Sequence, residues 1–491
     1  MEKLTDSLQQ NLKWFQNALP SEDILTYSFQ TADGVDAVIL YADGLVNKQL
    51  LGDLIARPLS KLCLNDKGRY ATKEEFIEKS MLFPELKKPQ TAQEMSEEIL
   101  DGNALLLVDT LAVGFVVGAK LLPVRSIIEP PTDVAVKGPR EGFIEDIKTN
   151  MALVRKRLKT PDLRFENLRV GKRSDTALAV CYLEGTCNAE LKEEIKSKLQ
   201  EIQIDCVPDS SYIAALLSPR KHSIFRSLGT TEKPDIFAAK LSEGRVGILV
   251  DGSPIALTAP FILTEYLQSS EDYFISPFMA TIFRFLRVLS LFVAILLPAF
   301  YVSAQLFKMQ LLPLGLMLTI ASSVRELPLS PSLEMFVVLL LLEVLKEASI
   351  RMPKYVGMSL SVVGALVLGE TAVSAGFLST PAIIVVAFSG ICLYTIPNFV
   401  ETGSVLRWLF LLVAGSIGPF GIMLFVAFLA YYLISADAFG TPILAPFSPL
   451  IAHDLRDSVV KYDMLNLQTR PKFMRTKNKV RLRVPDEKKE K

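Results

Sequence analysis

The apolar stretch VLSLFVAILLPAFYVSAQLF, residues 288–307, divides this 491-residue chain into two parts. It carries no charged side chain, and it reaches the length of about 20 mostly apolar residues that a helix needs to cross a bilayer. Residues 1–283 alternate charged and apolar segments as soluble α/β chains do, whereas long apolar runs dominate residues 288–434. The expected fold class is therefore an α/β soluble N-terminal region with two subdomains, followed by an all-α polytopic membrane domain.

Patterns before this stretch predict the two α/β subdomains. In the first, DAVILYADGLV (36–46) is typical of a buried strand that ends in an Asp-Gly turn. In the second, TALAVCYLEG (176–185) predicts a strand, NAELKEEIKSKLQEI (188–202) predicts a helix, and Asp251-Gly252 predicts a hairpin. The expected domains are an N-terminal α/β subdomain (1–140), a second α/β subdomain (141–283), a polytopic membrane domain of four to six helices (284–440) and a basic cytoplasmic tail (441–491).

Charge around the apolar runs predicts how the chain lies in a membrane. Arg284 and Arg287 precede the first run, and residues 453–491 hold 12 Lys and Arg against 6 Asp and Glu. Because positive flanks stay in the cytoplasm, both ends are expected there, and the number of crossings should be even. The start of the chain shows no apolar signal-peptide core, which also favours a cytoplasmic N-terminal domain. The candidate spans are 288–307, 356–377, 378–400 and 407–435. The segments 310–324 and 331–353 could be a re-entrant pair, two spans, or one span and one interfacial helix.

Composition and motifs argue against several classes of function. The formal net charge is zero, and the chain has no P-loop, no G-x-G-x-x-G after a strand, no H-E-x-x-H and no G-x-S-x-G. The five cysteines are scattered, as expected of reduced structural thiols. We therefore expect no enzyme activity, cofactor, metal or nucleic-acid partner. The basic cluster Arg155, Lys156, Arg157 and Lys159 fits a solvated helix face best, and a lipid-headgroup or interdomain contact second.

The run at 356–377 has two contrasting sides. One side is a stripe of small residues at every fourth position, which lets helices approach closely: Gly357, Ser361, Ala365 and Gly369. At 100° per residue, Glu370 lies opposite Ser361. The candidate pore-facing residues on that side are Ser359, Val363, Leu366 and Glu370. The alternative is that Glu370 is simply hydrogen-bonded inside a helix bundle.

The preceding segment, PSLEMFVVLLLLEVLKEASIRMP (331–353), is amphipathic. Glu343, Glu347 and Arg351 recur every four residues, with Lys346 beside them, and Glu334 lies near the start of the expected helix, where the dipole favours a carboxylate. We expect the four later charges to face an interface, a neighbouring subunit or the vestibule of a channel. A helix lying on the membrane surface explains the same pattern without a pore.

Four strings closely resemble the A subunits of bacterial spore germination receptors, the GerA family. They are ILYADGLV, VKGPREGFIEDIKTNMALVRKRLKTPDL, RELPLSPSLEMFVVLLLLEVLKEASIRMP and SLSVVGALVLGETAVSAGFLSTPAIIVV. The resemblance covers residues 25–465. Many receptor A subunits have Gln-Ala-Ala where this chain has Glu370-Thr371-Ala372, and that departure is similar to the stage V sporulation protein AF type of the family.

The resemblance implies a multi-pass protein of the spore inner membrane, with the N-terminal domain and C-terminal tail on the core side. It implies a homo-oligomeric, ion-channel-forming subunit that promotes release of ions or dipicolinate during germination. Its partners would be the lipid bilayer, a transporter-like B-type subunit and a lipoprotein. The family segment Gly138, Pro139, Arg140 and Glu141 would link neighbours or couple the soluble domain to gating, unless Arg140 and Glu141 only pair locally in a turn. A scaffold that conducts nothing and organises germination partners is the alternative function.

Overall fold

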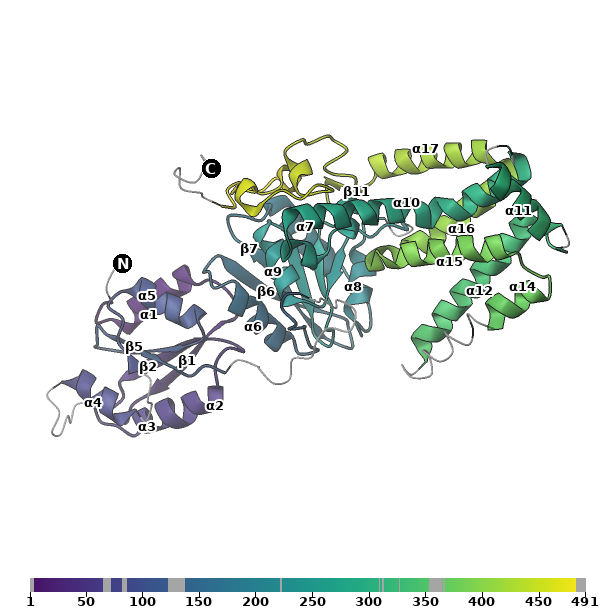
Figure 1. Ribbon diagram of the computed structural model, residues 1–491. Coiled ribbons are helices and arrows are strands. Elements are labelled where there is room, and N and C mark those ends of the chain that lie inside the picture. Colours follow the sequence, from purple (N-terminus) through teal and green to yellow (C-terminus); the bar gives the residue numbers. More distant parts are fainter. Residues whose placement is uncertain are drawn as a thin grey trace.

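The computed structural model describes residues 4–64, 72–81, 86–121, 137–220, 223–308, 310, 313–325, 327–352, 364 and 367–482. These residues form an N-terminal α/β domain, a second α/β domain, and a region of long helices that extends away from both (Figure 1). The final part of the chain lies back along the second domain, beside the start of the first long helix (Figure 1).

The first domain is a five-stranded antiparallel sheet with helices on both faces, in the strand order β1-β2-β4-β5-β3. Val38 and Leu40 on β2 pack with the cluster under α1 and α5, whereas Ile39 packs with the cluster under α2 to α4. This alternation follows from the two-residue period of a strand. The elements are α1 Leu8–Ala18, β1 Ile24–Gln30, β2 Asp36–Ala42, α2 Lys48–Leu51, η1 Gly52–Ala56, α3 Arg57–Ser60, α4 Lys73–Ser80, β3 Leu86–Lys87, α5 Ala92–Leu100, β4 Ala104–Val108 and β5 Gly114–Val117.

The second domain repeats this topology, in the strand order β6-β7-β9-β10-β8. Leu178 and Val180 on β7 pack toward α7 and α8, and Ala179 and Cys181 pack toward α6 and α9. The elements are α6 Ile147–Arg157, β6 Leu163–Val170, β7 Thr176–Leu183, α7 Ala189–Gln200, α8 Ser210–Leu217, β8 Gly229–Thr231, α9 Pro234–Ser242, β9 Val246–Val250 and β10 Ala256–Ala259. Asp251-Gly252 lies between the antiparallel strands β9 and β10, as the hairpin prediction requires.

Local contacts in the two domains show that they are structural repeats. The Asn11 side chain bonds the backbone N–H and C=O of Thr5, and Asn150 bonds those of Ile144 in the same way. The first helix of each domain, α1 or α6, is also capped by an aspartate that follows a strand of the sheet. The Leu8 N–H donates to Asp109 at 3.0 Å, and the Ile147 N–H donates to Asp251 at 3.3 Å.

The repeat extends to the turn after the second strand of each domain. The sequences YADGLVN (41–47) and YLEGTCN (182–188) share a Tyr, an acidic residue followed by Gly, and a final Asn. Gly44 and Gly185 have φ angles of 77° and 74°, which residues with a Cβ rarely adopt. The final Asn then caps the next helix. The shared motif therefore encodes the same strand–turn–helix unit twice.

A buried ion pair joins the two domains. Arg155 on α6 has 1% of its side chain exposed and donates from Nε and NH2 to Asp23, at 2.9 and 2.7 Å. Lys159 pairs with Asp101 of the first domain, while Lys156 and Arg157 pair with Glu141. The prediction of a solvated helix face is therefore wrong for Arg155, because an interdomain carboxylate removes it from water. The interdomain alternative describes the cluster better.

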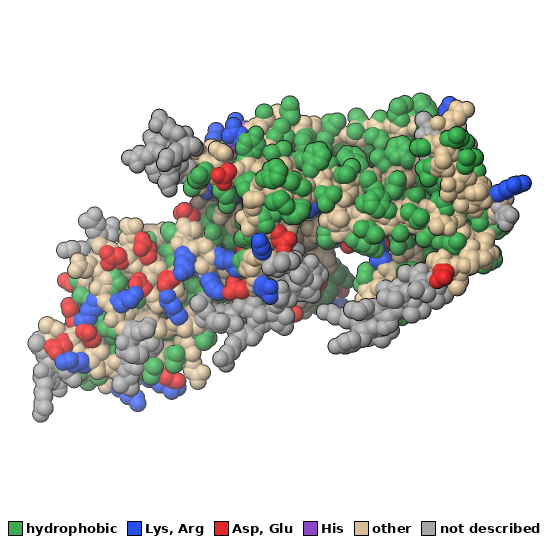
Figure 2. Space-filling view, viewed as in Figure 1, with side chains coloured by type: hydrophobic (Ala, Val, Ile, Leu, Met, Phe, Trp, Pro, Cys, Tyr) green, Lys and Arg blue, Asp and Glu red, His purple; other side chains and the backbone are tan. Residues whose placement is uncertain are grey.

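The helical region presents hydrophobic side chains over most of the visible surface, whereas charged side chains are spread over the first domain (Figure 2). Two helices, Pro277–Phe307 and Pro397–Ile417, are long and apolar enough to cross a membrane. The expected span at 407–435 is instead two helices, because Gly418 has a φ of 73° and Pro419 cannot continue the helical hydrogen bonds. The elements are α10 Pro277–Phe307, α11 Leu314–Val324, α12 Pro331–Arg351, η5 Val367–Thr371, α14 Ala372–Ser374, α15 Thr380–Tyr394, η6 Pro397–Phe399, α16 Val400–Ile417 and α17 Pro419–Ser435.

After α17 the chain forms a segment that we call the strap, residues 436–482. It contains β11 Asp437–Ala438, β12 Thr441–Pro442, η7 Asp454–Arg456, η8 Met464–Asn466 and η9 Lys472–Met474. Ala436, Ala438 and Ile443 are buried in the core of the second domain, and Thr476 packs against Gly244. The sequence predicted a basic tail here, and the structure shows that the tail packs on the folded domain as far as its described end.

Candidate functional site

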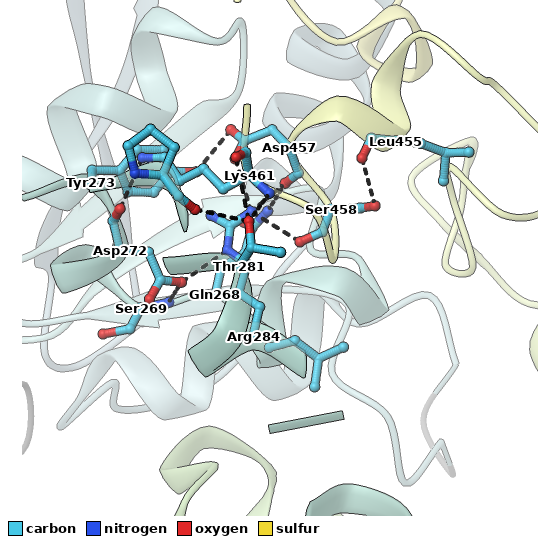
Figure 3. Close-up of polar contacts among 12 residues, drawn as sticks. Gln268, Ser269, Asp272, Tyr273, Thr281, Arg284, Leu455, Asp457, Ser458 and Lys461 are labelled. Atoms are coloured by element: carbon cyan, nitrogen blue, oxygen red, sulfur yellow. Dashed lines mark hydrogen bonds and ion pairs between the residues drawn. The ribbon is translucent and has the colours of Figure 1, made fainter. Parts of the chain in front are cut away.

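The strap, the second domain and the start of α10 meet in a charged junction of five residues: Asp272, Arg284, Arg287, Asp457 and Lys461. Asp272, Arg284, Asp457 and Lys461 are labelled in Figure 3. Arg284 is fully buried, and its Nε donates to Asp272 Oδ2 at 3.0 Å. Its NH1 donates to the strap, at 3.0 Å to the Asp457 carbonyl, 2.9 Å to Asp457 Oδ1 and 2.9 Å to the Ser458 carbonyl. One guanidinium therefore holds together segments that are far apart in the sequence.

The surrounding groups add further hydrogen bonds to the junction. Arg287 forms two bonds with Asp272, at 2.8 and 2.9 Å, and Lys461 Nζ donates to the Asp272 carbonyl at 2.9 Å. The Tyr273 hydroxyl donates to Asp457 at 3.0 Å. Lys461 Nζ lies 3.9 Å from the centroid of the Tyr273 ring, which adds a cation–π contact.

The electrostatics keep Asp272 charged. Burial would raise the pKa of Asp272, but hydrogen bonds from Arg287 and Arg284 outweigh it and hold that pKa below its usual value. Burial lowers the pKa of Lys461 and raises the pKa of Tyr273 well above its usual value. The junction is thus a dense ionic contact that is shielded from water.

Local sequence explains how α10 presents Arg284. Ser276 caps the helix by accepting from the Met279 N–H, and Pro277 occupies the first turn, where no N–H is required. Just before it, Asp272 accepts from the Ser269 N–H and so closes the preceding turn. The Lys461 N–H donates to Thr281 Oγ1 at 3.1 Å, which sets the register of the strap against α10.

A cavity of about 730 Å³ lies next to the junction, between the second domain and the strap. Arg245 and Lys240 line it and hold Glu265, at 2.5 and 2.9 Å. Burial would raise the pKa of Glu265, but these two cations keep it below its usual value. Arg287 of the junction also lines the cavity, so its walls include both the α/β domain and the first long helix.

The family segment reaches the same place from the interdomain linker. Gly138 has a φ of 120°, and a Cβ at this position would lie 2.6 Å from the ring of Phe274, the residue that follows Tyr273. Glu141 binds Lys156 at 2.6 Å and Arg157 at 2.8 Å, both on α6. The segment therefore connects α6 to the junction, and Glu141 is engaged by α6 rather than only by its own turn.

A second set of charges lies among the helices. Arg407 on α16 has 1% of its side chain exposed, and its NH2 donates to Glu343 at 2.8 Å while its NH1 donates to Ser389 at 3.2 Å. Lys346 pairs with the same carboxylate and donates to Ser404 at 3.2 Å. The sequence analysis placed Glu343 and Lys346 on one charged side of the segment 331–353 but did not identify Arg407 as their partner. In the sequence Arg407 is a single cation at the start of an apolar run.

Arg351 and Glu347, the other two of these four charges, pair at 2.6 Å with 77% and 57% of their side chains exposed. The four charges therefore divide into an inner pair that contacts Arg407 of α16 and an outer pair that lies at the surface. That the outer pair faces an interface or a vestibule stays a prediction. An α-helix turns by about 100° per residue, so residues four apart are displaced by about 40° around its axis. One row of charges can therefore reach from the packed side of α12 to its exposed side.

Only part of the proposed conduit lies within the described residues. Glu370 is exposed in η5, and an added Cβ at Gly369 would meet no atom within 4 Å. The remaining predicted residues lie outside the described part of the chain: Gly357, Ser359, Ser361, Val363, Ala365 and Leu366. At Gly364, which is described, a Cβ would lie 2.7 Å from Leu345 of α12, so a small residue allows close approach there.

These features define the class of protein. Two repeated α/β domains are joined through buried ion pairs to a helical region, and two helices described in that region are long and apolar enough to cross a membrane. A profile of the Bacillus/Clostridium GerA spore germination protein family matches residues 10–473, and the chain belongs to that family. The resemblance found in the sequence is thus confirmed at the level of the family, and the role of the chain lies in spore germination.

The chain is similar to individual proteins and to one solved domain. Spore germination protein KA of Bacillus subtilis (strain 168) is 32% identical over 453 residues, which is 91% of this chain and 82% of that protein. The membrane protein YfkQ of the same organism is 33% identical over 451 residues, covering 91% and 87%. The crystal structure of the N-terminal domain of the A subunit of the Bacillus megaterium spore germinant receptor GerK3 has 27% identity and a TM-score of 0.42, covering 52% of this chain and 96% of that one.

Proposed function

We propose that this chain is an A-type, channel-forming subunit that oligomerises in the spore inner membrane and releases ions or dipicolinate during germination. The observation that carries the proposal is the contrast between charges in the helical region. Glu343 pairs with both Lys346 and Arg407 within the helical region, whereas Glu370 is exposed. A carboxylate on the outside of an apolar helical region requires water or a polar neighbour, and a conduit shared between protomers would supply both.

The two α/β domains would then control the opening of the channel. Arg284 fixes α10 through one hydrogen bond to Asp272, just before the helix, and three to the strap, which packs on the second domain. Gly138 brings the interdomain linker against Phe274 beside this junction. Movement of the α/β domains would therefore be passed to α10 without an intervening flexible linker. Both flanks would face the spore core, with a transporter-like B-type subunit and a lipoprotein as partners, and Glu370-Thr371-Ala372 favours the stage V sporulation protein AF type.

The test is Glu370→Gln in germinating spores, with cation efflux and its ion selectivity as the measurements. Glu401→Gln is the matched control, because this carboxylate is also exposed but pairs with Arg226 of the second domain. We expect the first variant to change the efflux rate or the selectivity and the control to leave both unchanged. Equal behaviour of the two variants would remove Glu370 from the conduit.

A second measurement separates a channel from a scaffold. Purified full-length protein, alone and with its B-type partner, is added to planar bilayers. Conductance that differs between wild type and Glu370→Gln supports the channel. Absence of conductance in both preparations would favour a protein that organises germination partners without conducting.

A further inference from the structure

Glu334, near the start of α12, is fully buried inside the helical region. Its Oε1 accepts a hydrogen bond from the Ser379 N–H at 2.5 Å, at the beginning of α15, whereas its Oε2 has no hydrogen-bond partner in the described part of the chain. The sequence placed this carboxylate near a helix start, where partial positive charge favours it. The structure adds that two helix starts meet at one side of the carboxylate and leave its other oxygen without a donor.

Two polar side chains of α10 lie near this group. Tyr301 and Gln305 are four residues apart and so share a face of the helix. Tyr301 packs in one apolar cluster with Met335, the residue after Glu334, and with Leu378, the residue before Ser379. The Tyr301 hydroxyl and both amide atoms of Gln305 are buried and form no hydrogen bond with any described residue. Buried polar atoms that lack a protein partner are usually bonded by a water molecule or an ion.

The surroundings make this arrangement costly without a ligand. Tyr301, Met335 and Leu378 belong to one apolar cluster, so the polar groups lie within apolar packing. Within the described ranges, no Lys, Arg or His side chain forms an ion pair with Glu334. An ionised buried carboxylate without a counter-charge costs several kcal/mol, and partial charges at helix ends offset only about 1 kcal/mol of it.

We propose that Glu334, Tyr301 and Gln305 form a binding site for a monovalent metal cation. The donors would be Glu334 Oε2, the Tyr301 hydroxyl oxygen and Gln305 Oε1, which are the oxygen ligands that hard cations prefer. A single carboxylate matches a single positive charge, whereas calcium sites commonly gather several carboxylates. The bound ion joins α10 to the starts of α12 and α15 and so stabilises their packing. The site does not depend on conduction, because none of its residues is a candidate for the pore.

The test measures thermal unfolding of the full-length protein in detergent, in chloride salts of Na⁺, K⁺ or N-methyl-D-glucamine at constant ionic strength. The melting temperature of the wild type should rise with the concentration of Na⁺ or K⁺, because a ligand that binds only the native state stabilises it by RT ln(1 + [L]/Kd). Glu334→Gln and Tyr301→Phe should lose that rise. Glu347→Gln and Tyr431→Phe are the controls, since both side chains are exposed, and they should keep it.

A direct measurement covers variants that fold poorly. Equilibrium binding of ⁸⁶Rb⁺ to wild type should be saturable, displaced by unlabelled K⁺ or Na⁺, and reduced at least tenfold in affinity by Tyr301→Phe, which removes only a hydroxyl group. Equal melting temperatures of wild type in all three salts would overturn the proposal. It would also be overturned if Tyr301→Phe binds ⁸⁶Rb⁺ as wild type does, or if stability depends on pH alone, as a protonated carboxyl would require.

Discussion

Replacing Arg284 by Gln should release the strap from α10. The change removes four hydrogen bonds that join the helix to Asp272, Asp457 and Ser458. Breaking a buried ion pair costs about 3–5 kcal/mol. We expect the lower end of this range, because Asp272 keeps its two bonds from Arg287 and Asp457 keeps its bond from Tyr273. A loss of about 3 kcal/mol corresponds to roughly a hundredfold increase in the detached population.

Limited trypsin digestion of the full-length protein measures that population, since cleavage follows the open fraction when reclosing is fast. The readout is the rate of cleavage within the strap, at Lys472 or Arg475. Arg169→Gln is the matched control, because Arg169 and Asp175 pair with 66% of each side chain exposed. Such a pair contributes about 0–1 kcal/mol, so the control should digest like wild type. Equal cleavage rates for Arg284→Gln and Arg169→Gln would refute the view that the junction holds the strap.

Two further predictions concern titration and thiol chemistry. The native pKa of Asp272 lies below its unfolded value of about 3.9. The stability that Asp272 contributes is therefore present above that pH and is lost as the pH falls through the native pKa. Pepsin should cut the strap faster on acidification, and Asp272→Asn should abolish that dependence. Burial raises the pKa of Cys187 to about 12, so among the five thiols only the two exposed ones, Cys63 and Cys206, should be alkylated in the native protein, and mass spectrometry should count all five only after denaturation.

The fold was largely predictable where local pattern decides structure. The DAVILYADGLV and TALAVCYLEG strands lie where their apolar residues predicted, because a strand covered on both faces must be apolar on both. The repeat between the domains also has a signal in the sequence, the similar segments YADGLVN and YLEGTCN. These segments are so short that their similarity becomes significant only when the two domains are seen to share one topology. The division of the 407–435 run was also readable from Gly418-Pro419, since that pair interrupts helical hydrogen bonding.

The sites were less predictable, because their residues meet only after folding. Arg155 was interpreted as part of a solvated basic face, yet Asp23, 132 residues away, buries it between domains. Arg407 received no role, although it neutralises Glu343 among the helices. Glu334 was assigned to a helix start, and the two α10 side chains beside it were not singled out. A charged residue gives the same signal in a sequence whether its partner is water or a distant helix.

The sequence by itself determined the family and the alternation that builds each sheet. These properties depend on composition and on the spacing of residues over short segments, and both can be read directly from the sequence. Only the tertiary structure decided that the basic tail is a strap, that Arg284 joins it to α10 across 173 residues, and that the charges of α12 divide between an interior pair and a surface pair. The physical reason is that burial and ion pairing are properties of contacts, and contacts between distant segments exist only in the folded chain.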